Sequence, residues 1–361
     1  MYIETDFERK QYLFDPINNR KYYNRLQMLV HFEPTTKLDF YFQDEFWEGL
    51  DWTQEPSDSF DDLLKERAQQ IRDKYDYIIL YYSGGSDSHT MLMSFLKNNI
   101  FIDEIVVSNF YTGGENIIFK DLSLVVIPNL KKMHVLMSKT KITVLNLTPE
   151  NFDNFITSNK WESSNFTGTL NSFRRLTLDE LAQIGVEGTI RDRTRKGHIY
   201  AEFKPRIRVE GDDFYYKFSS KNLSIMSPYK ELFFTTSDLP DLHLKQCFLV
   251  KNYIKKFHPT FQGECLESTP STRQLLWEAC RLPFNQAFQL DKNGGIFGNV
   301  DTTIINEESV VLQSLKQDRY NVYDNYINGL LKPILTETNK GLIDLKHKDV
   351  ISLYKEFHLG T

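Results

Sequence analysis

Hydrophobic and polar positions between residues 57 and 150 predict strands and helices in regular alternation. Three short, continuous apolar runs are typical of strands buried within a parallel sheet. They lie at 77–82, 104–110 and 141–147. Apolar residues at helical spacing precede and separate these runs, at 57–74, 89–98 and 122–138. Strands and helices that alternate at these distances predict an α/β fold with a doubly wound, mainly parallel sheet.

The pattern is less regular on both sides of this segment, which divides the chain into three parts. Residues 1–56 form an N-terminal extension rich in aromatic and acidic side chains, and residues 57–150 form the α/β core. Residues 151–361 form a substrate and C-terminal region that is expected to be mostly helical. There the pattern predicts, in order, a helix at 173–184, a basic loop at 191–198, a hairpin of 199–210 with 214–219, a helix from 239, and helices at the end of the chain.

Composition adds one anomaly to an otherwise ordinary globular chain. Hydrophobic residues make up 40% and charged residues 25%, which excludes collagen-like and wholly disordered classes. Aromatic residues reach 14%, so large rings supply much of the apolar surface that folding must bury. Either a core rich in rings or a surface that stacks a planar ligand accounts for this surplus.

Charge and cysteine content limit the partners and the compartment. A net charge of −6 excludes a chain-wide basic field for nucleic acid, although a local patch is compatible with it. Three widely spaced cysteines do not make a disulfide framework, and they fit a reducing compartment. No apolar run is long enough to span a bilayer, and the first ten residues lack the apolar stretch of a signal peptide. We therefore expect a cytoplasmic protein that does not engage membranes.

The loop Ser83 to Ser88 carries the strongest chemical signal in the chain. It reads S-G-G-S-D-S and lies between the first predicted strand and a predicted helix. Its glycines let the backbone turn tightly, successive amides form an anion-binding nest, and the helix adds its positive N-terminus. Asp87 would repel a bare phosphate, but a bridging Mg²⁺ ion would explain its presence. Because the loop lacks the lysine of a Walker motif and the third glycine of a dinucleotide fingerprint, we predict a site for a metal-bound polyphosphate.

This loop resembles the S-G-G-x-D-S motif of the PP-loop ATP pyrophosphatases, a superfamily of proteins similar to the adenine nucleotide alpha hydrolases. Its members include asparagine synthetase, GMP synthetase, enzymes that form 7-deazaguanine and several tRNA-modifying enzymes. All six positions match, and the resemblance covers residues 75–150. It implies a Rossmann-like, HUP-like core with ATP and Mg²⁺ as cofactors. It also implies cleavage of ATP to AMP and pyrophosphate, with adenylation of an acceptor oxygen that a nitrogen nucleophile then attacks.

The resemblance implies roles for individual residues. Asp87 would hold Mg²⁺ and act in catalysis, and the end of the second strand would meet the adenine through its backbone. The residues that would cradle the phosphates are Ser83, Gly84, Gly85, Ser86 and Ser88, and those that would meet the adenine are Ser108, Asn109 and Phe110. Catalysis would then consist of charge neutralisation and positioning.

Basic residues beyond the core are further candidates. The stretch 191–198 is either a solvated loop or a clamp for the triphosphate or an anionic second substrate. Its candidate ligands are Arg191, Arg193, Arg195 and Lys196, and arginines there would bind phosphate through paired hydrogen bonds. Lys204 and Arg206 flank a proline that suggests a strand edge, and both are candidate catalytic residues. Together with residues 242–247 they resemble uncharacterised phage-encoded PP-loop proteins, for which the compartment would be the host cytoplasm.

The second substrate leaves several alternatives open. A tRNA or a single nucleic acid strand is one, because the basic stretch and nearby aromatic rings would suit it. If the acceptor is planar, it would stack on rings outside the predicted core. These are Phe40, Tyr41, Phe42, Phe46, Trp47, Trp52, Phe214, Tyr215 and Tyr216. If those rings are buried, the surplus is only packing.

Two other functions compete with the leading one. Glu264 and Cys265 resemble the start of the Glu-Cys-Gly-x-His motif of sulfonucleotide reductases, although Leu266 and Glu267 follow in place of the rest. The other alternative is a non-catalytic module that binds ATP. The chain starts Met1-Tyr2 and so lacks the N-terminal cysteine of a glutaminase. His243 and Cys247 have a metal-ligand spacing, but a position in the core of a helix is the preferred interpretation.

Overall fold

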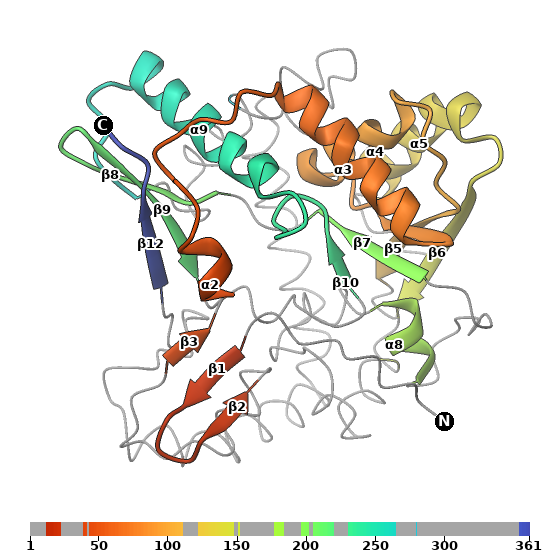
Figure 1. Cartoon of the computed structure of the whole chain (residues 1–361). Helices are drawn as coiled ribbons and strands as arrows, with labels where there is room; N and C mark the ends of the chain where they lie inside the picture. Colours follow the sequence, from red (N-terminus) through yellow and green to blue (C-terminus); the bar gives the residue numbers. More distant parts are fainter. Residues whose placement is uncertain are drawn as a thin grey trace, which may run out of the picture.

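The part of the chain that the structure describes forms three β-sheets, with helices packed against the larger two (Figure 1). The computed structural model describes residues 12–22, 39–41, 43–110, 122–147, 151, 177–183, 196–201, 205–219, 230–264, 279 and 354–361. Among the helices in these ranges, none combines the length and the apolar character needed to cross a membrane.

The largest sheet has five strands, and all of its neighbouring strands are parallel. Its order is β10 (Lys230–Leu232), β7 (Lys196–Tyr200), β4 (Tyr77–Tyr81), β5 (Glu104–Phe110) and β6 (Lys141–Leu147). Numbered along the chain and read from β6, these strands run 3-2-1-4-5. The prediction of an α/β fold with a parallel sheet is thereby confirmed.

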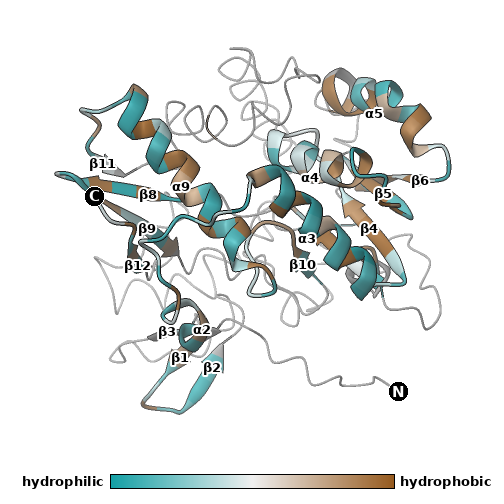
Figure 2. Cartoon of the chain, turned by 45° about the horizontal axis from the view of Figure 1, so that its top comes forward, coloured by the Kyte–Doolittle hydropathy of each residue, from teal (hydrophilic) through white to brown (hydrophobic). Residues whose placement is uncertain are grey.

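Helices cover one face of this sheet and bury its aliphatic side chains. α3 (Phe60–Lys74) and α4 (Ser86–Leu96) pack against each other over β4, which is hydrophobic along most of its length (Figure 2). The Ser59 side chain caps α3 by accepting a hydrogen bond from the Asp62 amide at 3.1 Å. Between β5 and β6 the chain forms the π-helix η1 (Leu122–Val126), α5 (Ile127–Met133) and the 3-10 helix η2 (His134–Met137). Buried residues of η1, α5 and η2 join the same hydrophobic core.

The opposite face of the sheet carries a polar network. The Tyr81 hydroxyl lies 3.0 Å from Nδ1 of His198 on β7 and accepts a hydrogen bond from the Leu178 amide at 2.8 Å. Leu178 begins the short helix α8 (Leu178–Gln183), so this bond ties α8 to the sheet. The Tyr81 ring also stacks on Tyr200 with centroids 4.2 Å apart.

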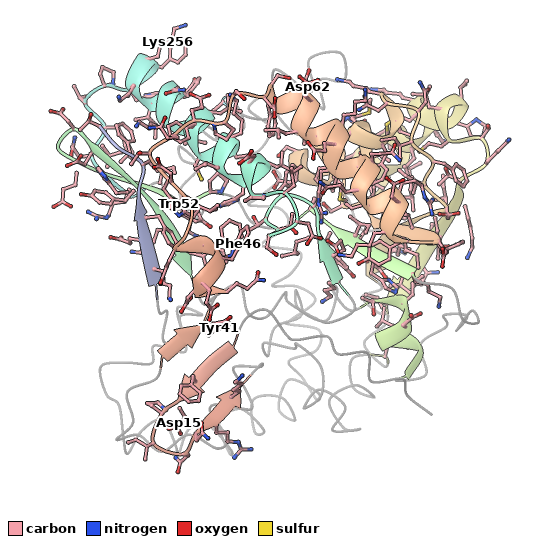
Figure 3. All side chains as sticks on the ribbon, in the orientation of Figure 1. Asp15, Tyr41, Phe46, Trp52, Asp62 and Lys256 are labelled. Atoms are coloured by element: carbon pink, nitrogen blue, oxygen red, sulfur yellow. The ribbon has the colours of Figure 1, made fainter. Side chains whose placement is uncertain are left out.

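A second sheet is antiparallel and is built around a cluster of aromatic rings. Its order is β11 (Gly263–Glu264), β8 (Ile207–Glu210), β9 (Asp213–Ser219) and β12 (Tyr354–His358), and α9 (Pro240–Phe257) packs on β8. Trp52, labelled in Figure 3, stacks on Phe357 at 4.4 Å and on Tyr216 at 5.1 Å between ring centroids. Its indole nitrogen donates a hydrogen bond to the Trp47 carbonyl at 2.8 Å.

The N-terminal region contributes a small sheet and a short helix. The sheet has the order β2 (Arg20–Tyr22), β1 (Tyr12–Asp15) and β3 (Asp39–Tyr41), and α2 (Asp44–Trp47) follows it. In the turn between β1 and β2, the Asp15 carboxylate accepts hydrogen bonds from the amides of Ile17 and Asn18. These bonds lower the pKa of Asp15 although its desolvation acts in the opposite direction.

Three expectations about the region beyond residue 150 are corrected. Residues 196–198 do not belong to a loop, because they begin β7 in the middle of the parallel sheet. The hairpin consists of β8 and β9 turned at Gly211, while residues 199 and 200 belong to the other sheet. The end of the chain forms a strand, β12, where a helix was expected. The parallel sheet therefore draws β7 and β10 from beyond the predicted core boundary at residue 150.

Candidate phosphate-binding site

The loop Ser83 to Ser88 leaves the carboxyl end of the central strand of the parallel sheet. In the strand order, β4 lies between β5 and β7. The strands that come next in the sequence, β5 and β6, lie on one side of β4, and the later strands, β7 and β10, lie on the other. The chain from β4 leads to β5 through α4, whereas β7 comes much later in the sequence. Ligands of open parallel sheets bind at the carboxyl ends of the strands, at the point where the strand order changes direction, which is β4 in this sheet.

The backbone of the loop takes the shape that its glycines allow. Gly84 has φ +73°, a conformation that residues with a side chain rarely adopt, and a Cβ atom there would lie 2.8 Å from Cγ2 of Val126. Gly85 is the N-cap of α4, so the helix begins inside the loop at Ser86. The loop is therefore held between α4 and η1, with no room for a side chain at Gly84.

Two serine hydroxyls close the loop on itself. The Ser88 hydroxyl lies 3.1 Å from the Ser83 hydroxyl, accepts a hydrogen bond from the Ser83 amide at 3.2 Å and donates to the Gly85 carbonyl at 3.1 Å. The Ser83 hydroxyl also accepts a hydrogen bond from the Gly85 amide at 3.3 Å. Ser83 is exposed and Ser88 is buried, so the Ser83 residue is the one of the two that solvent reaches.

The start of α4 suits an anion, and Asp87 suits a cation bound beside it. α4 has 11 residues, and the aligned amides of its first turn give its N-terminus a positive partial charge. Asp87 lies in that turn and is partly exposed. Among the described residues, no group of three or more His, Cys, Asp or Glu side chains gathers into a metal site. A single carboxylate nevertheless fits Mg²⁺, which commonly takes one or two carboxylates and completes its shell with phosphate oxygens and water.

A buried hydrogen-bonded group lies directly beneath the loop. The Tyr82 hydroxyl is 3.0 Å from Nδ1 of His89 and 3.4 Å from Nδ2 of Asn129 on α5. Burial lowers the pKa of His89 to about 4, with a smaller contribution from Lys97, and burial raises the pKa of Tyr82. Both side chains are therefore neutral over the physiological range.

The predicted adenine-facing residues lie at the same edge of the sheet as the loop. Tyr81 of β4 pairs with Val106 of β5, so Ser108 follows two residues further toward the carboxyl end. The Asn109 side chain is buried and donates a hydrogen bond to Oδ1 of Asn146 on β6 at 3.0 Å. Phe110 ends β5, and its backbone is the part of it that the structure describes.

The predicted basic clamp is not assembled by the described residues. Lys196 pairs with Tyr77 at the amino end of β4, about 20 Å along the strand direction from the loop. Its ammonium group binds the Asp179 carboxylate at 3.1 Å, so the prediction that Lys196 contacts phosphate is corrected. Arg206 directly precedes β8 of the antiparallel sheet, where its carbonyl accepts a hydrogen bond from the Lys217 amide. The other candidates, Arg191, Arg193, Arg195 and Lys204, lie outside the described residues.

The aromatic residues proposed for stacking an acceptor are largely used in packing. Trp47, Trp52, Phe214 and Tyr216 are all buried. Tyr215 is partly exposed, but the Arg208 guanidinium lies 4.3 Å above its ring. Phe42 and the side chain of Phe40 lie outside the described residues. For the four buried rings, the interpretation as packing therefore replaces the interpretation as a stacking surface, while Tyr41 and Phe46 are only partly buried.

His243 and Cys247 lie in the core, as the preferred interpretation held. Both are fully buried on α9, and Nδ1 of His243 lies 3.0 Å from the Thr235 hydroxyl. Burial lowers the pKa of His243 to about 3. Cys265, the candidate redox residue, lies outside the described residues.

Sequence reasoning missed the group formed by Tyr82, His89 and Asn129. The apolar run that predicted β4 assigned Tyr82 to the core, and His89 was counted only as part of the following helix. A signal was present in the positions of the two residues, which directly precede and directly follow the loop. Asn129 lies too far away in the sequence for any local pattern to connect it with them.

Comparison of the chain with models of protein families found no match, and comparison with curated proteins found no significant one.

Proposed function

We propose that the protein is an ATP-binding enzyme of the PP-loop pyrophosphatase type, which cleaves ATP to AMP and pyrophosphate and adenylates an acceptor oxygen. One observation carries the proposal: an intact S-G-G-S-D-S loop leaves the carboxyl end of the central strand of a parallel sheet and starts a helix. Polyphosphate ligands favour this place in an open α/β sheet because amides and a helix N-terminus converge on it.

The strand order supports a doubly wound sheet of the Rossmann-like, HUP-like kind. The order 3-2-1-4-5 has its reversal at β4, the strand that carries the loop. In open α/β sheets, ligands bind at the carboxyl ends of the strands where the strand order reverses. The sequence motif and the sheet topology thus both favour a ligand site at the carboxyl end of β4.

In this function the residues of the loop bind and orient the pyrophosphate half of ATP. The amides at the start of α4 and the exposed Ser83 hydroxyl would donate hydrogen bonds to the β- and γ-phosphate oxygens, and Ser88 would hold the loop in shape through its bonds to Ser83 and Gly85. Asp87 would hold Mg²⁺, which supplies charge neutralisation on the leaving pyrophosphate. The backbone at Ser108 to Phe110 would meet the adenine. A nitrogen nucleophile would complete the reaction by attacking the adenylated acceptor.

The products of ATP cleavage test this proposal. The full chain is incubated with Mg²⁺, ATP labelled at the α-phosphate, and acceptors that carry a carboxylate, an amide or a base carbonyl, tRNA included. The expected products are labelled AMP or labelled adenylate, with pyrophosphate released in equal amount. ADP and inorganic phosphate as the only products would overturn the proposal. Tight ATP binding without cleavage for any acceptor would instead indicate a non-catalytic nucleotide-binding module.

A pair of matched aspartate variants separates chemistry from folding. Asp87 is the second residue of α4, and Asp61 is the second residue of α3. Asp87→Asn should abolish turnover and leave the melting temperature almost unchanged, because the side chain lies at a helix start and is partly exposed. Asp61→Asn makes the same chemical change at the same position of another helix and should retain full turnover. Equal activity of both variants would argue against a metal role for Asp87.

A further inference from the structure

The two residues that flank the phosphate loop are joined to each other beneath it. Tyr82 directly precedes the loop and His89 directly follows it, and their side chains meet at 3.0 Å between Oη and Nδ1. The side chain of Tyr82 is 2% exposed and that of His89 is fully buried. A hydrogen bond between neutral groups in so buried a place is costly to leave unmade. The bond therefore fixes the separation of the two ends of the loop.

The direction of the hydrogen bonds follows from the third member of the group. The Asn129 amide nitrogen can only donate, so the Tyr82 hydroxyl accepts from it and keeps its own proton for another partner. Nδ1 of His89 lies within hydrogen-bond distance of the hydroxyl and accepts this proton in the neutral tautomer that is protonated at Nε2. The depressed pKa of His89 is consistent with this, because a neutral imidazole offers one accepting nitrogen.

The same helical segment that supplies Asn129 also presses on the loop itself. Val126 ends η1, and its side chain leaves no space for a Cβ atom at Gly84. Asn129 lies three residues further along, in α5. The segment thus contacts the loop at its tight turn and the Tyr82 hydroxyl at its base, which are two independent contacts on one structural unit.

We propose that Tyr82, His89 and Asn129 form a hydrogen-bonded clamp that sets the shape of the phosphate loop and are thereby positioning residues for the pyrophosphate half of ATP. This inference rests on the proposed function. None of the three touches the nucleotide in this proposal. They act by holding Ser83 at one end of the loop and the first turn of α4 at the other, so that hydroxyls and amides converge on the phosphates before ATP arrives. Such preorganisation lowers the ordering cost of binding.

The structure supplies a matched control for the clamp on the other face of the sheet. Tyr81 is also a buried tyrosine, and its hydroxyl also lies 3.0 Å from Nδ1 of a buried histidine, His198. Tyr81→Phe and Tyr82→Phe therefore remove the same kind of bond from adjacent positions of one strand. The clamp involves only Tyr82, so the two variants should differ in ATP affinity and resemble each other in stability.

The experiment measures the dissociation constant of Mg-ATP by calorimetry for the full chain and its variants. Tyr82→Phe removes the hydroxyl that bonds both His89 and Asn129, and it should weaken binding by roughly three- to tenfold. Tyr81→Phe should bind like the wild type. His89→Leu breaks only the bond between His89 and Tyr82, so it should weaken binding by no more than Tyr82→Phe does. The double variant Tyr82→Phe/His89→Leu should be no weaker than Tyr82→Phe, because Tyr82→Phe already breaks that bond.

A conservative variant of His89 separates the effect of the hydrogen bond on ATP affinity from a general effect of His89 on folding. In His89→Asn the amide oxygen can take the place of Nδ1 as the acceptor, so binding should return close to the wild-type value although the imidazole is gone. Wild-type affinity in Tyr82→Phe, equal weakening in Tyr81→Phe, or additive losses in the double variant would each overturn the clamp while leaving the proposed function intact. Failure of the wild-type chain to bind Mg-ATP would overturn the proposed function itself.

Discussion

The two larger sheets of this protein use different side chains for different purposes. The parallel sheet is built on aliphatic strands such as β4 and ends, at its central strand, in a loop of serines and glycines. The antiparallel sheet alternates buried rings with partly exposed side chains along β9 and packs Trp52 against both Tyr216 and Phe357. A parallel sheet sends each strand out through its carboxyl edge into a connection, which leaves backbone amides there for a ligand.

This difference between the two sheets separates the candidate site from the part of the molecule that serves packing. In the antiparallel sheet a tight turn at Gly211 joins β8 directly to β9, and their inner faces are filled by rings. In the parallel sheet the connection after β4 holds polar groups in a fixed, partly exposed arrangement. Among the described residues, the aromatic rings therefore contribute mainly to stability, and the small polar residues of the loop form the candidate site. The following changes test this division, from the largest expected effect to the smallest.

Acid should destabilise both regions, because each contains a histidine that is buried in its neutral form. The pKa of His89 falls from 6.5 to about 4 and that of His243 to about 3 on folding. The unfolded chain takes up protons first as the pH falls, so stability is complete above pH 6.5 and is lost as the pH approaches these lower values. Each histidine contributes about 3 kcal/mol or somewhat more to this loss.

Urea unfolding across this pH range measures the effect. His89→Asn should flatten the curve by about half, since among the described histidines His243 is the other one whose pKa is lowered by burial. A free energy of unfolding that stays constant from pH 6.5 to pH 4 would show that neither imidazole is held in its neutral form.

Truncation of Trp52 should be the most costly single substitution in the antiparallel region. Trp52→Ala removes a stacked, buried ring and should lower the free energy of unfolding by roughly 3–5 kcal/mol. Phe46→Ala is the control, because Phe46 is only partly buried and makes its edge contact with Trp47 alone among the described rings, and it should cost much less. A stable Trp52→Ala variant that loses acceptor binding would instead make this cluster a ligand surface.

A methyl group at Gly84 should damage the loop more than the same change at a glycine of the other sheet. Gly84→Ala meets both an unfavourable φ and the Val126 side chain, and should cost roughly 3 kcal/mol and most of the ATP affinity. Gly211 also has a positive φ, of +60°, but no atom lies within 4 Å of its Cβ position. Gly211→Ala should therefore cost about 1 kcal/mol and leave ATP binding unchanged.

Chemical denaturation and calorimetry on the two glycine variants report both quantities. Equal stability losses would mean that the contact between Gly84 and Val126 is relieved by a small shift of η1.

Loss of the α3 cap should have the smallest of these effects. Ser59→Ala removes the acceptor for the Asp62 amide and should lower the free energy of unfolding by about 1 kcal/mol. Ser57→Ala lies two residues earlier on the exposed surface and should change it by only a few tenths of a kcal/mol, which is typical of surface substitutions. Equal melting temperatures for the two variants would contradict the capping role. Neither substitution should affect nucleotide binding.

The elements nearest the loop were predictable because their signals are local. The apolar run at 77–82 predicted β4 within one residue of its end. The run at 141–147 predicted β6 at the same bounds. In contrast, the position of Lys196 could not be predicted, because its neighbours in the sequence are basic and its partners in space are Tyr77 and Asp179.

The sequence by itself determined the strand, the loop and the helix that follow one another from Tyr77 to Leu96, because backbone preference and side-chain period act over a few residues. Only the tertiary structure decided that β7 and β10 complete the parallel sheet, and that the basic residue at 196 lies at the edge away from the loop. It alone brought Asn129 to Tyr82 and His89. Strand pairing and buried hydrogen bonds join segments that are distant in the sequence, and they depend on how the core as a whole excludes water.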